Sequence, residues 1–372
     1  MTKKLSLYIG LMSGTSLDGV DAVLVDFTQN TPKLITSHSH SIPKDLQNKL
    51  LTITQPDWTG SIIEIGTLHQ QLGKLFSYAS QSLIKKSGIN LRDIHAIGSH
   101  GQTIWHQPNG ELPFSLQLGD ANLISENTGI TTVADFRSRD MSAGGQGAPL
   151  VPAFHHAILS HPKKNRIILN IGGIANISHL PSKISSRTVM GFDTGPGNGL
   201  IDAWIHHHKG ASFDKNGDWA RSGRIISDLL NKLLETPYFS LTAPKSTGKE
   251  FFNLAWLKKT LKDDLNNNKP EDIQATLTEL TAKTVADKID DSCDELFICG
   301  GGIHNQFLIE RLQFHIPHIP IKSSQILGIP PDWMEAIAFA WLAKQTIEGK
   351  PGNLPSATGA KGSRILGAIY PA

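Results

Sequence analysis

Short apolar runs alternate with longer segments of helical period along the first 142 residues of the chain. The runs have the length and residue types of β-strands and lie at 5–11, 20–27, 33–39, 94–99, 114–118 and 131–134. Between the third and the fourth run, apolar residues from Ile62 to Phe76 recur every three or four positions, which predicts a helix over 62–86. Strands and helices are therefore expected to alternate in this part of the chain.

A similar order begins again after residue 142. The segment 143–152 is too rich in Gly and Pro for a regular element, and we interpret it as a crossover between domains. A strand at 167–171, a glycine turn and a return strand at 174–180 then repeat the strand–glycine–strand unit of the first lobe, as a weak repeat of architecture. Further helices are expected at 199–208, 224–234, 273–290, 304–314 and 333–348, before a short strand at 364–370.

This alternation predicts an α/β protein with two lobes. The first lobe is expected to span 1–142 and the second 143–349, with the tail 350–372 returning to the first lobe. A chain of 372 residues exceeds the size at which one hydrophobic core stops growing, which also favours two domains. We expect the ligand cleft to lie between the two lobes.

Composition narrows the classes of function. With 35 basic and 33 acidic residues, the net charge of +2 provides no footprint for nucleic acid or an anionic membrane. Cys293 and Cys299 form no CxxC pair, so neither a disulfide framework nor a structural zinc site is expected. The apolar start LSLYIGLM is short and lacks an A-x-A site, and no apolar run approaches the roughly 18 residues of a membrane span. We expect a soluble cytoplasmic protein.

The segment YIGLMSGTSLDGVD at 8–21 says most about chemistry. Its small-residue turn allows the backbone to approach a ligand, so that free N–H groups can surround phosphate oxygens. Asp18 and Asp21 follow the turn, and their carboxylates could hold or orient a hydrated Mg²⁺. Taken alone, the segment could also be a hairpin with a polar turn.

Two more glycine turns follow apolar strands. Gly172 and Gly173 lie in NIGGIAN, and Gly300, Gly301 and Gly302 lie in CGGGIHN, where a strand opens directly onto a helix. Because a helix N-terminus favours anionic groups, the junction of strand and helix at CGGGIHN suits a nucleotide. None of the three turns fits GxGxxG, and the STGKE sequence is not a P-loop. One such turn is as readily structural, but three in order favour nucleotide binding.

Several charged residues could take part in catalysis. Asp193 in GFDTGPGN ends a strand expected at 188–192, where its carboxylate can be a general base or simply an Asx-turn or helix N-cap. Arg137 and Arg139 could clamp a carboxylate or phosphate, or they could pair with aspartates at the surface. Glu335 opens an apolar helix, where a first-turn acidic residue is favourable in any case.

Blocks spread over nearly the whole chain resemble anhydro-N-acetylmuramic acid kinases. They are GLMSGTSLDGVDAVL, IGSHGQTIWHQP, ADFRSRDMSAGGQGAPLVPAFH, NIGGIANIS, GFDTGPGNGLIDAWI, PKSTGKEFFN, CGGGIHNQ and PPDWMEAIAFAWLA. Several are too long and unusual to match by chance. Ser138 in DFRSRD stands where some members are expected to carry another Arg.

The resemblance implies the fold of sugar kinases, actin and Hsp70-type ATPases, with two α/β lobes and ATP in the cleft between them. It implies that ATP and water convert 1,6-anhydro-N-acetylmuramic acid, a product of peptidoglycan turnover, to N-acetylmuramic acid 6-phosphate. Ring hydrolysis and phosphoryl transfer are then coupled, with Mg²⁺ neutralising charge. The resemblance also implies a homodimer.

Roles of individual residues are carried over from the family at matching positions. Asp193 matches the catalytic aspartate, and Arg139 and Glu335 match further active-site positions. The phosphates are expected to contact the turn formed by Gly14, Thr15, Ser16, Leu17, Asp18, Gly19, Val20 and Asp21, together with Gly172 and Gly173 of the second lobe. The run 300–302 is expected to lie against the nucleoside. Mg²⁺ is expected to bind through the phosphates, with Asp18 or Glu335 as candidate protein ligands.

Two alternative functions stay open at this point. A kinase of open N-acetyl amino sugars would use Asp193 to deprotonate a hydroxyl group. An actin- or Hsp70-like ATPase switch would instead act through a partner protein and would produce no phosphorylated sugar.

Overall fold

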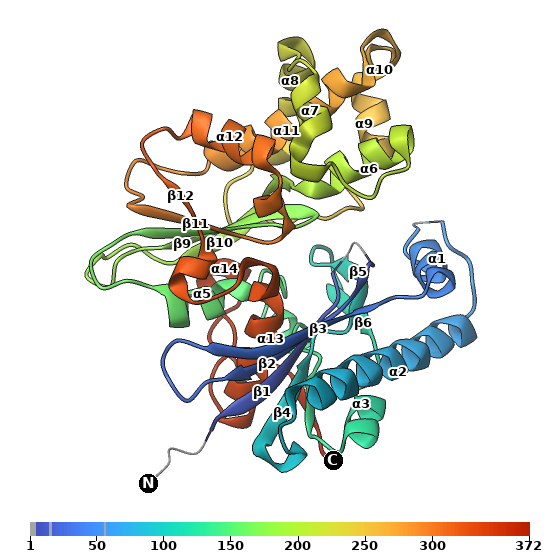
Figure 1. Ribbon diagram of the computed structural model, residues 1–372, viewed down its shortest axis with the longest axis vertical. Coiled ribbons are helices and arrows are strands. Elements are labelled where there is room, and N and C mark those ends of the chain that lie inside the picture. The colour runs from blue at the N-terminus through green and yellow to red at the C-terminus, as the bar shows by residue number, and fades with distance from the viewer. Residues whose placement is uncertain (1–4, 15–16, 56) are drawn as a thin grey trace. The chain divides into compact units, whose positions relative to one another are not determined.

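The computed structural model describes residues 5–14, 17–55 and 57–372. The chain folds into two compact units. Unit 1 comprises Met1–Ile158 and Trp333–Ala372, and unit 2 comprises Leu159–Asp332. Each unit contains its own β-sheet, with helices packed on it (Figure 1).

Unit 1 is built on a six-stranded sheet with the order β13-β7-β4-β1-β2-β3. Its strands are β1 (Leu7–Met12), β2 (Gly19–Asp26), β3 (Lys33–Ser41), β4 (Ile94–Ser99), β7 (Thr132–Ala134) and β13 (Ala368–Tyr370). The first three strands form an antiparallel meander, and β4 and β7 extend the sheet in parallel to β1. The C-terminal strand β13 pairs antiparallel with β7 at the edge.

The remaining elements of unit 1 are a hairpin and seven helices within the described residues. The hairpin consists of β5 (Gln102–Gln107) and β6 (Phe114–Leu118). The helices are α1 (Lys44–Ile53), α2 (Ile62–Ser87), α3 (Ala121–Thr128), α4 (Ser138–Ser142), α5 (Val151–Leu159), α13 (Met334–Ile347) and α14 (Pro355–Thr358), with a 3₁₀ turn at Leu91–Asp93.

Helices α2 and α13 cover opposite faces of the unit 1 sheet. Side chains alternate along a strand, so Ile9 and Leu11 of β1 point into the core shared with α2, whereas Gly10 between them lies under α13. Helix α2 begins after Ser61, whose side chain accepts a backbone N–H, and ends at Ser87, followed by the capping Gly88 with a left-handed φ of 65°. These caps explain why the predicted helix at 62–86 forms almost as expected.

Unit 2 is built on a five-stranded sheet with the order β10-β9-β8-β11-β12. Its strands are β8 (Arg166–Ile171), β9 (Ile174–Leu180), β10 (Met190–Pro196), β11 (Glu295–Cys299) and β12 (Ile321–Ser323). Strands β8, β9 and β10 form an antiparallel meander, and β11 and β12 run parallel to β8.

The described helices of unit 2 are α6 (Asn198–Lys209), α7 (Asp218–Ser222), α8 (Ser227–Leu234), α9 (Leu254–Leu261), α10 (Asp264–Asn267), α11 (Pro270–Ala286) and α12 (Gln306–His315). Helix α11 is largely buried and packs against α6, α7, α8 and α12. Short 3₁₀ turns occur at Lys215–Gly217, Pro237–Ser240, Gly301–His304, Ser324–Leu327 and Pro331–Trp333. Figure 1 shows α6 to α10 gathered in one cluster, and its core includes Trp204, Leu233 and Leu257.

The two sheets share one strand order. The sequence β3-β2-β1-β4-β7 in unit 1 corresponds to β10-β9-β8-β11-β12 in unit 2. In unit 1, β1 is antiparallel to β2 and parallel to β4, and in unit 2, β8 is in the same way antiparallel to β9 and parallel to β11. The predicted repeat of architecture is confirmed, as is the two-lobed α/β fold class.

The limits of the units differ from the lobes expected from the sequence. Residues 143–158 and 333–349 belong to unit 1, although they were expected in the second lobe. Helix α13 explains the difference at 333–349, because it packs on β1 and β4 of the unit 1 sheet. The tail 350–372 is also part of unit 1.

Some local predictions need correction. Strand β10 does not end before Asp193, because its pairing with β9 continues from Asp193 to Pro196. The Gly- and Pro-rich segment 143–152 is irregular only to Leu150, after which α5 begins. The sequence pattern also missed α1, α3 and β5, all of which are short elements.

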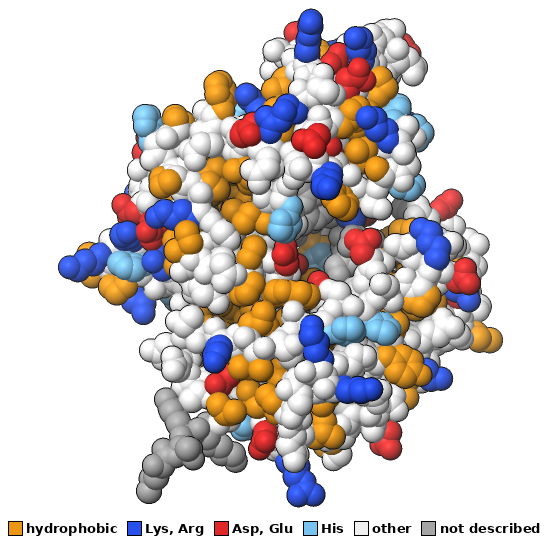
Figure 2. All heavy atoms as spheres, in the orientation of Figure 1, with side chains coloured by type: hydrophobic (Ala, Val, Ile, Leu, Met, Phe, Trp, Pro, Cys, Tyr) orange, Lys and Arg blue, Asp and Glu red, His pale blue; other side chains and the backbone are white. Residues whose placement is uncertain are grey.

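Basic and acidic side chains are interspersed over the visible face of each unit (Figure 2), in keeping with the net charge of +2. Among helices in the described part of the chain, none has both the length and the apolar character that a bilayer span requires.

Candidate active site

The first glycine turn connects β1 to β2 in unit 1. Thr15 and Ser16 lie outside the described residues, whereas Gly14 and Leu17 on either side are described. Leu17 has a left-handed φ of 60°, and its N–H donates to the Gly14 carbonyl at 3.3 Å. A non-glycine residue with this φ is uncommon and marks a constrained turn. Gln47 of α1 holds the far side of the turn by donating to the Leu17 carbonyl at 3.1 Å.

Gln102 contacts the same turn where it leaves β1, at Ser13 and Gly14. Its side chain is buried, and its Oε1 lies 2.7 Å from the Ser13 hydroxyl, which donates to it. The Gln102 amide nitrogen donates to the Gly14 carbonyl at 3.3 Å. The site residues predicted from the sequence did not include Gln102. The block IGSHGQTIWHQP could have pointed to it, because this block places the buried polar side chain of Gln102 just after a strand.

Carboxylates of unit 1 lie beside this turn. Asp18 is exposed, and Asp21 is partly buried and accepts a hydrogen bond of 2.6 Å from the Ser39 hydroxyl. Burial raises the pKa of the Glu335 carboxyl, Arg137 lowers it, and the charge of Asp21 raises it again. The structure therefore brings Glu335, on the first turn of α13, into electrostatic range of Asp21.

The structure separates the two arginines of DFRSRD. Arg139 is exposed on α4, whereas Arg137 is partly buried and donates to the Gly147 carbonyl at 2.8 Å. Arg137 Nη2 lies 2.7 Å from His100 Nε2. Because a guanidinium only donates, His100 Nε2 must accept, and the ring is a neutral tautomer with its proton on Nδ1. Burial, followed by the charge of Arg137, lowers the pKa of His100 to about 3 and that of His106 to about 4.

A cavity of about 110 Å³ opens beside His100 at the ends of β4 and β7. The lining side chains include His69, Ser99, His100, Asp120, Asp135 and Tyr370. The Ser99 hydroxyl is fully buried and has no hydrogen-bond partner among the described residues. The cavity thus offers donors and acceptors for a small polar group of a ligand.

In unit 2, the second glycine turn packs backbone to backbone against the loop after β10. The Asn198 N–H donates to the Gly172 carbonyl at 2.8 Å, and the Gly197 N–H donates to the Gly173 carbonyl at 3.0 Å. A Cβ on Gly197 would lie only 2.4 Å from the Gly172 carbonyl oxygen, so this approach requires glycine. The Lys249 side chain also reaches this loop, with its Cε 3.2 Å from the position of a Cβ on Gly199.

The third glycine turn, at 300–302, packs against the end of β8, next to the turn at 172–173. A Cβ on Gly300 would lie 2.3 Å from Asn170 Oδ1, and one on Gly302 would lie 2.5 Å from Ile171, at the end of β8. The run does not open directly onto α12 as expected, because the 3₁₀ turn Gly301–His304 precedes that helix. The glycine turns at 172–173 and 300–302 therefore meet at the carboxyl ends of β8 and β11.

Asp193 is held by contacts from one segment of unit 2. Its Oδ2 accepts the Thr247 N–H at 2.9 Å, its N–H donates to the Lys245 carbonyl at 3.1 Å, and its carbonyl accepts the Tyr238 hydroxyl at 2.8 Å. The register of β10 shifts between Asp193 and Gly195, and such a bulge redirects a side chain. Asp193 is not the N-cap of α6, because Gly197 occupies that position.

Comparison with known proteins decides the family. A sequence profile of anhydro-N-acetylmuramic acid kinases matches residues 6–372. The chain is 51% identical to the anhydro-N-acetylmuramic acid kinase of Xylella fastidiosa (strain Temecula1 / ATCC 700964) over 98% of this chain and 96% of the relative. It belongs to the anhydro-N-acetylmuramic acid kinase family.

Two further relatives with the same name agree with this assignment. The protein of Pasteurella multocida (strain Pm70) is 49% identical over 98% of this chain and 96% of the relative. That of Saccharophagus degradans (strain 2-40 / ATCC 43961 / DSM 17024) is 50% identical over 99% of both. A ROK family glucokinase from Streptomyces griseus, solved with glucose and AMPPNP, is 13% identical over 91% of this chain and 100% of that chain, with a TM-score of 0.41.

The sites predicted for this kinase family member fall into two sets. In unit 1 the turn at 14–21 lies near Glu335, with Arg139 exposed on α4. In unit 2 the glycine turns cluster, and Asp193 lies on the strand that leads into their loop. Within the described residues, no group of three or more His, Cys, Asp or Glu side chains could hold a metal ion by itself.

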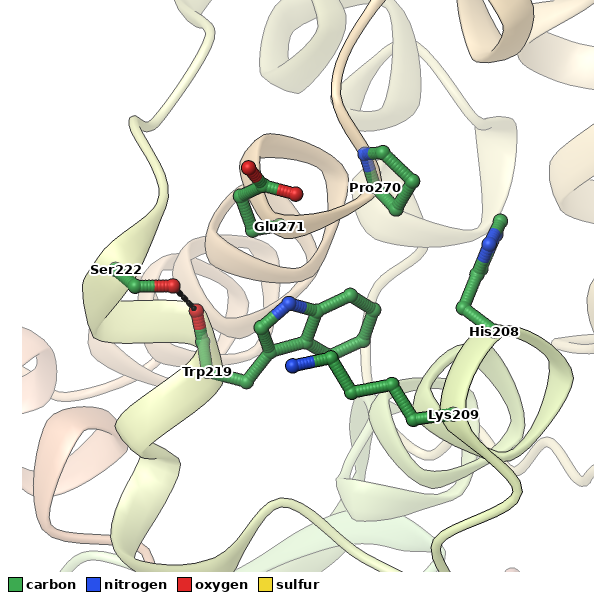
Figure 3. Close-up of a pocket in the computed structure, with 6 residues that line it drawn as sticks. All are labelled: His208, Lys209, Trp219, Ser222, Pro270 and Glu271. Carbon is green, nitrogen blue, oxygen red and sulfur yellow. Dashed lines mark hydrogen bonds between the residues drawn. The ribbon is translucent and has the colours of Figure 1, made fainter.

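A separate hollow lies on the helical cluster of unit 2 (Figure 3). It has a volume of about 360 Å³ and is lined by His208, Lys209, Trp219, Ser222, Pro270 and Glu271. The Lys209 ammonium lies over the Trp219 ring, 4.6 Å from its centroid, and the Ser222 hydroxyl donates to the Trp219 carbonyl at 2.7 Å. None of the predicted site residues lines this hollow.

Proposed function

We propose that this chain is an ATP-dependent kinase that converts 1,6-anhydro-N-acetylmuramic acid and water to N-acetylmuramic acid 6-phosphate in cell wall recycling. About 50% identity to relatives of that name over almost the full chain supports the substrate. The geometry that supports the reaction is the carboxylate of Asp193, held by the Thr247 N–H beside a cluster of glycine turns.

The substrate chemistry explains why a general base is needed. In the anhydro sugar, O6 is an ether oxygen and has no proton to lose. A water molecule therefore adds to C1, and its proton passes to the carboxylate of Asp193. The C1–O6 bond breaks with its electron pair on O6. O6 then bonds to the γ-phosphorus of ATP, the bond from that phosphorus to the β-phosphate bridging oxygen breaks, and ADP leaves.

The turn at 14–21 would bind the phosphates of ATP. Gln102 and Gln47 hold the described ends of this turn, through Ser13 and Gly14 on one side and Leu17 on the other. Pre-formed N–H groups stabilise developing charge without reorganisation. Arg139 is exposed and would orient sugar or phosphate, whereas Arg137 would support the site from within, through His100.

Mg²⁺ fits the carboxylates of unit 1. This ion prefers oxygen ligands, keeps several waters and binds through one or two carboxylates together with substrate phosphates. Asp18, Asp21 and Glu335 offer such carboxylates, and the pKa of Glu335 responds to both Asp21 and Arg137. When bound, the ion would neutralise negative charge on the phosphates.

The glycine turns of unit 2 would take the rest of the nucleotide. Gly172 and Gly173 would approach phosphate oxygens, and Gly300, Gly301 and Gly302 would lie against the nucleoside. Their mutual packing leaves backbone without side chains at the ends of β8 and β11. Lys249 lies beside Gly199 in this cluster and adds a cation that suits a polyphosphate.

We further propose a cytoplasmic homodimer. Cys293 and Cys299 are both buried free thiols, which agrees with a reducing compartment. The family resemblance supports the dimer. Light scattering of the purified protein at micromolar concentration tests it, and a mass near 40.5 kDa would contradict it.

A parallel assay tests the proposed activity. Purified protein receives ATP with either the anhydro sugar or open N-acetylmuramic acid, and product phosphate esters are measured by mass spectrometry. Phosphorylation of the anhydro sugar supports the proposal. Activity on the open sugar alone would favour a kinase of open amino sugars, and ATP consumption without a phosphorylated sugar would favour an ATPase switch.

A further inference from the structure

Lys245 is a buried lysine in the segment that holds Asp193. Its residue is 5% exposed, and its Nζ donates to the Tyr238 carbonyl at 3.0 Å and lies 4.4 Å from the centroid of the Tyr238 ring. Removing an ammonium from water is costly, and a methionine of similar length would fill the same space without that cost. A buried cation at this position therefore calls for a functional reason.

Lys245 reaches Asp193 by two routes. Through the main chain, the Lys245 carbonyl accepts the Asp193 N–H at 3.1 Å. Through the side chain, Lys245 holds the Tyr238 carbonyl, and the hydroxyl of the same tyrosine donates to the Asp193 carbonyl at 2.8 Å. The lysine thus closes a ring of contacts around the backbone of the aspartate.

The charged and titratable groups that face Lys245 come from different elements. Asp193 lies on β10, Tyr238 on the 3₁₀ turn Pro237–Ser240, and Lys288 just after α11. Burial and then the charge of Lys288 lower the pKa of Lys245 to about 8, and Asp193 opposes them. Burial and the charge of Asp193 keep the Tyr238 pKa well above its usual range, so the phenol stays a neutral donor.

Electrostatic coupling between two groups is reciprocal. The Asp193 carboxylate favours the charged form of Lys245, so the Lys245 ammonium must favour the ionised form of Asp193 to the same extent. An ionised carboxylate is the form that can accept a proton from water. At neutral pH, below the Lys245 pKa of about 8, the ammonium is present and acts in this direction.

We propose that Lys245 is a positioning residue for the general base, because its ammonium keeps Asp193 ionised while its contacts with Tyr238 hold the backbone of β10 in place. This inference rests on the proposed function of Asp193. It adds a role for the lysine at the start of the PKSTGKEFFN block, beside those already given to Thr247 and Lys249.

The test compares Lys245→Met with the matched variant Lys288→Met. Lys288 donates to the Phe239 carbonyl at 3.3 Å, so both variants remove a lysine that holds the same 3₁₀ turn. The measured quantity is kcat/KM for the anhydro sugar at saturating ATP from pH 4.5 to 8. Its acid limb reports protonation of Asp193, because activity is lost as the pH falls through the pKa of the base.

For Lys245→Met we expect the acid limb to move to higher pH by about one unit and kcat to fall about tenfold or more. Lys288→Met should leave the acid limb in place. Lys245→Arg, which keeps the charge, should return the limb toward its original position. An unmoved limb in Lys245→Met, or an equal shift in Lys288→Met, would overturn the inference.

A second readout does not depend on turnover. Carbodiimide couples an amine to protonated carboxyl groups, and peptide mass spectrometry measures its rate at Asp193 as a function of pH. Lys245→Met should shift this profile to higher pH, as in the kinetics, and an unshifted profile would overturn the inference. If the unmodified protein phosphorylates no anhydro sugar, the proposed function fails while this profile still tests the coupling. Should Lys245→Met fail to fold, as judged by its melting temperature, Lys245→Gln takes its place in both measurements.

Discussion

Gly10 and Gly98 are direct partners across the parallel strands β1 and β4, and helix α13 lies against both. A Cβ on Gly10 would lie 1.9 Å from the Ala336 carbonyl oxygen, and one on Gly98 would lie 2.1 Å from that of Phe339. No side chain fits in either space. Since Glu335 precedes Ala336 on the first turn of this helix, the close packing at the two glycines sets where the Glu335 carboxyl lies relative to Asp21 of β2.

Gly98→Ala is therefore expected to displace α13 and to cost about 1–3 kcal/mol of stability, the usual cost of overpacking. Chemical denaturation measures this change. Gly66→Ala is the matched control, because Gly66 lies in α2 and a Cβ there would meet nothing within 4 Å. The control should gain roughly 0.5–1 kcal/mol from helix propensity. Equal stabilities of the two variants would contradict the packing argument.

Asp193→Asn is expected to lower turnover of the anhydro sugar by about a hundredfold or more, because the amide cannot accept the proton of water. Nucleotide binding should change little, since the glycine turns remain. Calorimetry with ADP and steady-state kinetics measure the two effects. The control is Asp228→Asn on the exposed start of α8, which should be as active as the original protein. A near-normal rate for Asp193→Asn would assign the base elsewhere.

Arg139→Ala is expected to weaken the use of sugar more than the binding of nucleotide, because Arg139 is exposed on α4 and free to meet a ligand from solvent. Arg137→Ala should behave differently. It removes the contacts with Gly147 and His100, so we expect a lower melting temperature. Calorimetric titrations with sugar and with ADP distinguish the roles, and a larger loss of ADP affinity in Arg139→Ala would refute the one proposed here.

Stability should fall in mild acid because of His155. This side chain is fully buried, and burial lowers its pKa from 6.5 to about 3. Below pH 6.5 the His155 imidazole binds a proton in the unfolded chain, but in the folded chain it stays neutral until the pH nears 3. The contribution of His155 to stability is therefore fully present above pH 6.5 and is lost as the pH falls toward 3. Between these two pKa values, the free energy of unfolding falls by about 1.4 kcal/mol for each pH unit. Denaturation at pH 7 and pH 5 should show a smaller difference for His155→Phe than for the original protein; equal differences would rule out this assignment.

Periodicity predicted much of the fold because strands and α2 carry their signal locally. The runs at 94–99 and 114–118 became β4 and β6 with the expected limits, and Ser61 and Gly88 cap α2 close to its predicted ends. By contrast, the membership of α13 in unit 1 depends on Gly10 and Gly98, which are hundreds of residues away in the chain. A period within one segment cannot report such a contact.

The candidate site was predictable to the extent that single motifs carry it. The glycine turns and Asp193 stand in recognisable blocks, but the partners of Asp193 come from Tyr238, Lys245 and Thr247, 45 to 54 residues further along. Gln102 is similar, since its contact with Ser13 spans 89 residues. Buried polar contacts of this kind have no periodic signature, so the sequence motifs named candidate reacting groups and missed the residues that contact them.

The most direct test of the proposed chemistry follows oxygen. The protein, ATP and anhydro sugar are mixed in ¹⁸O-labelled water, and the product is reduced at once with borohydride to stop exchange at C1. The account predicts N-acetylmuramic acid 6-phosphate with one ¹⁸O at C1 and none in the phosphate group. A control incubates unlabelled product in the same labelled water for the same time, and the label that it acquires by exchange is subtracted. Label in the phosphate, or a product without label at C1, would contradict it.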